Sequence, residues 1–193
     1  MDGVRASNKN ARRAKPLYTP DEQRRRDETV WTLVQGVLAP VQFIVFLVSL
    51  ALVVRFLATG EGWLLATLSV IFKTLILYTI MITGSIWEKV VFGKYLFAGP
   101  FFWEDVVSIL VLALHTAYLA AVIADTINRS FMDPQAQMLL ALAAYAAYVI
   151  NAAQFLLKLR AARLQRAETP ATALTLQQVN TNTATGQLPG VSS

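Results

Sequence analysis

The residues that could do chemistry in this sequence gather in one apolar stretch, residues 101–118. Glu104 and Asp105 are adjacent, and His115, the only histidine of the chain, follows eleven residues after Glu104. In a helix this spacing leaves Glu104 and His115 about 20° apart around the axis and roughly 16 Å apart along it, with Ser108 between them on the same face. Ionisable groups are costly in lipid, so we interpret this face as a functional site turned toward a bundle interior.

These side chains are suited to proton transfer. Carboxyl groups and imidazoles are common general acids and bases. A third acid, Glu88, ends the preceding apolar block, and we expect it on the same side of the membrane as Glu104 and Asp105. Three carboxylates close together repel one another, so at least one is expected to hold a proton.

The composition excludes or weakens other chemistries. The chain has no cysteine, which excludes disulfides and thiolate sites. Its single histidine excludes a haem held by two histidines of one chain and weakens any case for zinc. The sequence has no Gly-rich phosphate loop and no metal-ligand cluster of credible spacing. We therefore expect acid–base chemistry with no bound cofactor.

Four long apolar blocks must position these residues. Of the 193 residues, 55% are hydrophobic, and the mean hydropathy is +0.49. Each block can cross a hydrocarbon core about 30 Å thick. We predict an all-α, integral membrane four-helix bundle with spans at about 30–57, 63–87, 104–124 and 136–159. The membrane domain, residues 17–166, is predicted to lie between a disordered basic arm, residues 1–16, and a disordered tail, residues 167–193.

Basic residues gather at the ends of the apolar blocks. This distribution indicates membrane topology and argues against a nucleic-acid partner, although the net charge is +5. Leaving out Lys73, fourteen Lys and Arg residues fall on one side of the predicted membrane and two on the other. Both termini and the three acids are therefore predicted to be cytoplasmic. The polar N-terminus shows no cleavable signal peptide.

A short amphipathic helix is predicted before the first span. Thr19 is a suitable N-cap, Pro20 fits the first helical position, and Glu22 stands where a capping box needs an acid.

Each predicted span also carries polar side chains along one face. Gln35, Gln42 and Ser49 recur every seven residues in the first span, and Asn151 and Gln154 share a face of the fourth. These groups either join helices by hydrogen bonds or line a substrate cleft. If all four faces point inward, they form one polar cleft that opens toward the cytoplasm and suits a large hydrophobic substrate.

Two further features leave alternatives open. Lys73 lies near the centre of the second span, where an ammonium group needs a structural partner, a substrate carboxylate or a role in proton transfer. The loop before the third span is rich in aromatic residues, which form either a belt at the lipid headgroups or a platform for a flat aromatic ligand. These residues are Phe92, Tyr95, Phe97, Phe101, Phe102 and Trp103.

Several strings resemble the vinyl bacteriochlorophyllide hydratase family, small integral membrane enzymes of bacteriochlorophyll synthesis. The most specific are WEKVVFGKYLF and FFWEDVVS, and LYTPDEQRRRDETVW, ATGEG and LLALAAYAAYVINAAQFLLKLRAARL also match. The resemblance covers about residues 17–166. It implies a carbon–oxygen lyase that adds water across the C3 vinyl group of (bacterio)chlorophyllide to give a 1-hydroxyethyl group. It also implies a multi-pass protein of the bacterial inner (cytoplasmic or intracytoplasmic) membrane.

The acids fit that implied reaction. The vinyl group should protonate at its terminal carbon, because the macrocycle delocalises the resulting cation, and water then adds to the inner carbon. Our hypothesis is that Glu104 or Asp105 donates the proton while the other stays ionised and stabilises the cation, with Glu88 as the third candidate.

The remaining polar residues are candidates for substrate binding. His115 is expected to ligate the substrate's magnesium, to orient the attacking water or to join two helices. Lys73 or an arginine at the cleft rim is expected to hold the substrate's propionate. The full set of predicted substrate-binding residues is His115, Lys73, Ser108, Gln42, Asn151, Gln154, Trp103 and Trp87.

Other functions compatible with the same spans stay open. A pigment-binding or handover protein would need the cleft and His115 but not the acids. A small-solute transporter is weaker, because the chain shows no repeated half. The expected partners are the pigment and water, the lipid bilayer, and either other pigment-biosynthesis enzymes or further copies of this chain.

Overall fold

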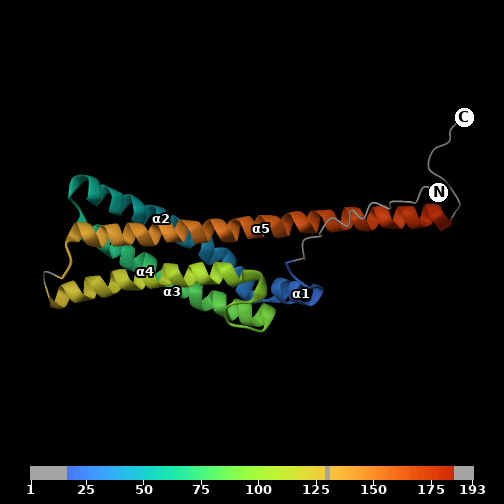
Figure 1. Cartoon of the computed structure of the whole chain (residues 1–193), viewed down its shortest axis with the longest axis horizontal. Coiled ribbons are helices and arrows are strands. Elements are labelled where there is room, and N and C mark those ends of the chain that lie inside the picture. Colours follow the sequence, from blue (N-terminus) through green and yellow to red (C-terminus); the bar gives the residue numbers. More distant parts are fainter. Residues whose placement is uncertain (1–16, 129–130, 185–193) are drawn as a thin grey trace, which may run out of the picture.

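A computed structural model describes residues 17–128 and 131–184, and every regular element in these ranges is a helix (Figure 1). The elements are α1 (Pro20–Glu28), α2 (Val30–Thr59), α3 (Trp63–Phe92), the 3₁₀ helix η1 (Gly99–Phe101), α4 (Phe102–Ile127) and α5 (Pro134–Ala184). The basic arm predicted for residues 1–16 lies outside the described residues.

The four predicted spans are helices, and each helix extends beyond its apolar block. By length and composition, α2, α3, η1 with α4, and α5 up to Ala161 can each cross a membrane. Their outer faces carry large apolar side chains that are more than half exposed, among them Leu33, Ile44, Leu64 and Leu156. Lipid is the solvent that suits such a surface, so the arrangement indicates a multi-pass membrane protein.

Neighbouring helices run antiparallel. Gln35 contacts Thr83 while Ser49 contacts Ser69, so residue numbers rise along α2 as they fall along α3. The closest pairings are α2 with α3 and α4 with α5, and contacts of α2 with α5 and of α3 with α4 complete the bundle. Consequently, the end of α3, η1, the start of α4 and the middle of α5 meet at one end of the bundle (Figure 1).

Several predicted polar residues join helices. The Gln35 amide donates to the Thr83 hydroxyl at 2.7 Å. The Ser49 hydroxyl lies 2.7 Å from that of Ser69 and 2.6 Å from that of Tyr145, so it connects three helices. For Gln35 and Ser49, the structure therefore favours the helix-joining interpretation.

The far end of α5 differs from the prediction. An irregular tail is expected from residue 167, but α5 continues as a helix to Ala184 and extends well past the other helices (Figure 1). Threonine is the most frequent residue of this part of the sequence and its helix propensity is low, so local propensity does not account for the extension. The last predicted tail residues, 185–193, lie outside the described residues.

The start of the described chain forms the expected helix. Thr19 caps α1, its hydroxyl accepts from the Glu22 N–H, and the Glu22 carboxylate accepts from the Thr19 N–H at 2.7 Å. The predicted capping box is thus confirmed, while the amphipathic character of α1 stays a prediction.

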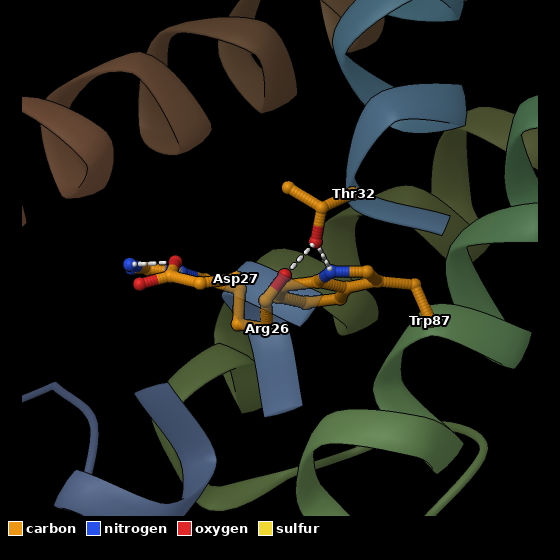
Figure 2. Close-up of polar contacts among 4 residues, drawn as sticks. All are labelled: Arg26, Asp27, Thr32 and Trp87. Carbon is orange, nitrogen blue, oxygen red and sulfur yellow. Dashed lines mark hydrogen bonds and ion pairs between the residues drawn. The ribbon is translucent and has the colours of Figure 1, made fainter. Parts of the chain in front are cut away.

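Helix α1 is anchored on the end of α3 by polar contacts. The Arg25 guanidinium donates twice to the carbonyl oxygen of Val91, at 2.9 and 2.7 Å, and so satisfies an acceptor in the last turn of α3. The Trp87 indole N–H donates to the Thr32 hydroxyl, which in turn donates to the carbonyl oxygen of Arg26 (Figure 2). These contacts fix the junction of α1 and α2 against α3.

Replacing Arg25 should loosen α1. Arg25→Met removes a charged donor and leaves the Val91 carbonyl without its partner, a loss of about 1.5–3 kcal/mol. Hydrogen exchange of the backbone amides of residues 20–28 should then accelerate by about tenfold to a hundredfold. The matched control is Arg24→Met, because the 3.8 Å contact of Arg24 with Glu28 joins two exposed side chains. Equal exchange rates in the two variants would contradict the anchoring role.

Candidate functional site

The structure brings the three predicted acids together at one end of the bundle. Glu88 comes from the last turns of α3, Glu104 and Asp105 come from the first turn of α4, and all three are buried. The side chains of Glu88 and Asp105 lie next to each other. A carboxylate is only an acceptor, so two carboxyl groups in contact form a hydrogen bond only when one of them carries a proton.

The loop after α3 holds this carboxyl pair through consecutive backbone N–H groups. The Phe97 N–H donates to Asp105 Oδ2 at 2.6 Å, and the Ala98 N–H donates to Glu88 Oε2 at 3.3 Å. Phe97 has a φ of 59°, in the left-handed region that bulky residues avoid. A strained residue of this kind persists when its surroundings fix it, and here its conformation aims two donors at two acids.

Lys158 of α5 completes the cluster. Its ammonium nitrogen lies 2.6 Å from Glu104 Oε2, also donates to the carbonyl oxygen of Pro100, and stands 5.0 Å from the centre of the Phe101 ring. The ion pair sets a positive charge directly against Glu104. The cluster therefore sets an ion-paired acid beside two carboxyl groups in contact.

Sequence reasoning missed the role of Lys158. Lys158 is not among the site residues predicted from the sequence and counts only as one of the basic residues at the ends of the apolar blocks. The sequence already places Lys158 on one helix face with Gln154 and Asn151, four and seven residues before it, but the pattern does not identify Glu104 as its partner. That face is turned toward the acids.

Aromatic residues surround the acid cluster on one side. The buried Phe101 ring lies 5.7 Å from Trp87, 5.7 Å from Phe92 and 6.0 Å from Phe155, measured between ring centres. Tyr18 stacks on Phe92 at 5.7 Å, and burial raises the pKa of the Tyr18 hydroxyl, which favours its neutral form. These rings pack against one another and form an aromatic wall on that side of the acid cluster.

The other loop aromatics lie outside that wall. Trp103 is 69% exposed and Tyr95 is 60% exposed. The structure therefore packs Trp87 against Phe92 and Phe101 but leaves Trp103 on the outer surface. Its side chain starts between those of Phe102 and Glu104, and on a helix adjacent positions point in different directions.

Lys73 and His115 form a second polar site, deeper in the bundle. Both are fully buried, and Lys73 Nζ lies 2.5 Å from His115 Nε2. His115 Nδ1 lies 2.7 Å from the carbonyl oxygen of Val111, which can only accept. The Nδ1 atom therefore carries the proton, and Nε2 accepts from Lys73.

The aromatic faces of α5 complete the surroundings of Lys73. Its ammonium nitrogen stands 4.2 Å from the centre of the Tyr148 ring and 5.2 Å from that of Tyr145. Among the described residues, no acid lies within ion-pair distance of Lys73. Of the alternatives for Lys73, the structure favours a structural partner, and that partner is His115.

The remaining predicted residues are buried amides and a hydroxyl. Asn151 donates through Nδ2 to the Ser108 hydroxyl at 2.8 Å, linking α5 to α4. The side-chain oxygens of Gln42, Asn151 and Gln154 are buried and accept no hydrogen bond from the described residues. Within the same ranges, no three His, Cys, Asp or Glu side chains are grouped as metal ligands. That the chain binds no cofactor stays a prediction.

Comparisons with known proteins agree on one family. The family model described as 2-vinyl bacteriochlorophyllide hydratase matches residues 18–161. A protein of Rhodobacter capsulatus with that name is 61% identical over 164 residues, which is 85% of this chain and 92% of the relative. A protein of Cereibacter sphaeroides with the same name is 62% identical over 149 residues, covering 77% and 89%. No solved structure matches.

The Lys73–His115 contact should make the two residues interdependent. His115→Leu leaves a buried ammonium without its polar partner and should lower the free energy of unfolding by at least about 1–3 kcal/mol. The double variant Lys73→Met with His115→Leu replaces both partners by apolar groups and should recover most of that loss. Equilibrium unfolding in detergent micelles measures both values. Strictly additive effects of the two substitutions would contradict a direct contact.

Proposed function

Because this chain belongs to the family of 2-vinyl bacteriochlorophyllide hydratases, we propose that its buried acid cluster carries out the addition of water to the substrate's vinyl group. The chain is an enzyme of bacteriochlorophyll biosynthesis, a carbon–oxygen lyase acting in the direction of hydration. The family favours this activity over the pigment-handover hypothesis. What remains to be assigned is how the residues of this chain perform it.

The reaction needs an acid, an anion and one water. A proton adds to the terminal carbon of the vinyl group, and the macrocycle delocalises the positive charge left at the inner carbon. The oxygen of water then bonds to that inner carbon. Loss of one proton from this oxygen gives the 1-hydroxyethyl group and returns the proton that was consumed. In a site of low polarity, the attraction between the cation and a negative charge beside it is stronger than in water.

The acid in this scheme is the Glu88–Asp105 pair. The proton that the two carboxyl groups share is the donor, and two carboxyl groups that hold one proton between them can release and recover it. Glu104, ion-paired with Lys158 at 2.6 Å, supplies the negative charge beside the cation. The contact between two carboxyl groups next to an ion-paired acid is the observation that carries this proposal.

The location of the cluster supports entry of the pigment from the cytoplasmic side. The acids lie at the end of the bundle where the chain's basic residues concentrate, and such residues face the cytoplasm. We assign the enzyme to the bacterial inner membrane on the same ground, with both termini cytoplasmic.

We propose that His115 ligates the substrate's magnesium, which requires that its contact with Lys73 first be broken. Its Nε2 is the coordinating atom, and it is engaged with Lys73 in this structure. Ligation would release the Lys73 ammonium, which could then pair with the propionate of the pigment. An unchanged absorption spectrum when the pigment binds to His115→Ala would exclude magnesium ligation.

Removing the acid pair should abolish turnover. Asp105→Asn and Glu88→Gln each eliminate the carboxyl partner that shares the proton, and we expect conversion of vinyl to hydroxyethyl pigment in membranes to fall by about 10²–10⁴-fold. The matched control is Glu61→Gln, because Glu61 is an exposed acid in the link between α2 and α3. Near-normal turnover by Asp105→Asn and by Glu88→Gln would remove the pair from the mechanism.

The ion-paired acid should give a different result. Glu104→Gln removes the charge next to the cation but leaves the proton donor, so turnover should fall by about 10²–10³-fold with pigment affinity little changed. Titration of the pigment's absorption against the variant measures that affinity. Loss of pigment binding in parallel with turnover would indicate that Glu104 acts on binding rather than on the reaction.

A further inference from the structure

We propose that Asn151 and Gln154 of α5 hold the water molecule that the reaction consumes. This inference rests on the proposed function, because it names the origin of the second reactant of that same site. Three observations carry it: two buried acceptors without donors, a hydroxyl that orients one of them, and their position one helical turn from the acids.

The two amide oxygens call for hydrogen-bond donors. Asn151 is only 9% exposed, and Oδ1 of Asn151 and Oε1 of Gln154 are both buried and accept no hydrogen bond from the described residues. A buried acceptor left unpaired costs about 1–3 kcal/mol, so such atoms normally meet a donor. Residues three apart lie on the same helix face, so both oxygens belong to one side of α5.

Ser108 determines which way the Asn151 amide faces. Its hydroxyl oxygen accepts from Asn151 Nδ2 at 2.8 Å, which turns Oδ1 away from α4. Ser108 follows Glu104 by four residues and Asp105 by three, so it lies one helical turn, about 6 Å, from the acids. Gln154 precedes Lys158, the partner of Glu104, by the same single turn. The amides are thus one turn deeper in the bundle than the acid cluster.

This spacing matches what the reaction requires. The acid and the water act on adjacent carbon atoms of one vinyl group, so the groups that hold them must stand a few ångströms apart. A water that donates its two O–H groups to Asn151 and Gln154 keeps a lone pair for the inner carbon. The new C–O bond forms there and leaves the oxygen positively charged. One O–H group then turns from its amide oxygen to the Glu104 carboxylate, this O–H bond breaks, and the proton passes to Glu104 and then to the Glu88–Asp105 pair, which gave its own proton to the terminal carbon.

His115 is less suited to this task. Its Nδ1 is bound to the carbonyl oxygen of Val111 and its Nε2 to Lys73, so neither nitrogen has a free position for a water. Orientation of the attacking water was one of the three alternatives for His115. We therefore assign this role to the amides of Asn151 and Gln154 instead.

Deuterium exchange separates the two halves of the reaction. In deuterated water the acid gives a deuteron to the terminal carbon. If no water attacks the cation, that carbon loses a proton back to the carboxylate, and the vinyl group is recovered with deuterium in it. Mass spectrometry of recovered substrate and of product therefore reports protonation and hydration in one incubation.

We expect Asn151→Leu and Gln154→Met to change the ratio of these outcomes. Hydration should fall at least tenfold, and deuterium in recovered substrate per product formed should rise at least tenfold. Gln137→Met is the matched control, because Gln137 Oε1 is a buried acceptor that is also unpartnered among the described residues, about 25 Å away from Gln154 along α5. It should keep the wild-type ratio.

Two results would overturn the inference. One is a fall of hydration and exchange by the same factor in Asn151→Leu and in Gln154→Met, which is what a purely structural role produces. The other is hydration and exchange at wild-type rates in both variants. If Asn151→Leu fails to fold, Gln154→Met decides, because Gln154 is only half-buried and methionine keeps its length.

Failure of this inference and failure of the proposed function give different patterns. Asp105→Asn should lose exchange and hydration together, because it removes the proton donor. If Asp105→Asn still exchanges and hydrates, the acid assignment is wrong whatever the amide variants do. If Asp105→Asn loses both activities while the amide variants keep the wild-type ratio, the acid pair stands and the water lies elsewhere.

Discussion

The contact between Glu88 and Asp105 is the interaction on which the rest of this end of the bundle depends. Two buried carboxyl groups that touch cannot both be ionised without strong repulsion, so our proposal places one proton between them. Around this pair the fold supplies backbone donors from Phe97 and Ala98, and Lys158 forms an ion pair with the third acid. The proposed proton donor and the proposed anion of the hydration reaction therefore lie side by side.

Much of the neighbouring structure serves to hold the loop that faces this pair. Phe97 is in a left-handed conformation, which costs a bulky residue about 1–3 kcal/mol. The ring of Phe101, packed between Trp87 and Phe92, fixes η1 at the far end of the loop. Helix α1 in turn fixes the end of α3 through the two hydrogen bonds from Arg25. The site is thus rigid because three elements far apart in the sequence converge on one short loop.

The sequence predicted the parts of this structure that depend on local pattern. Apolar length placed the four spans, the capping box placed α1, and helical spacing put Glu104, Ser108 and His115 on one buried face. It did not predict which buried groups would meet, because a periodic pattern gives a face and not its neighbour. Lys158 was interpreted as a membrane-edge cation, yet the antiparallel packing of α4 and α5 sets it on Glu104. The pairing of Lys73 with His115 depends in the same way on the register of two helices.

The most direct test of this account is the infrared spectrum of the purified protein in water and in deuterated water. A protonated carboxyl group has a C=O band that ionised acids lack and that shifts on deuteration. We predict this band in the wild-type protein and in Glu104→Gln, and its loss when Glu88→Gln and Asp105→Asn are combined. A wild-type spectrum without a protonated carboxyl band, or a band that persists in the combined variant, would contradict the shared proton.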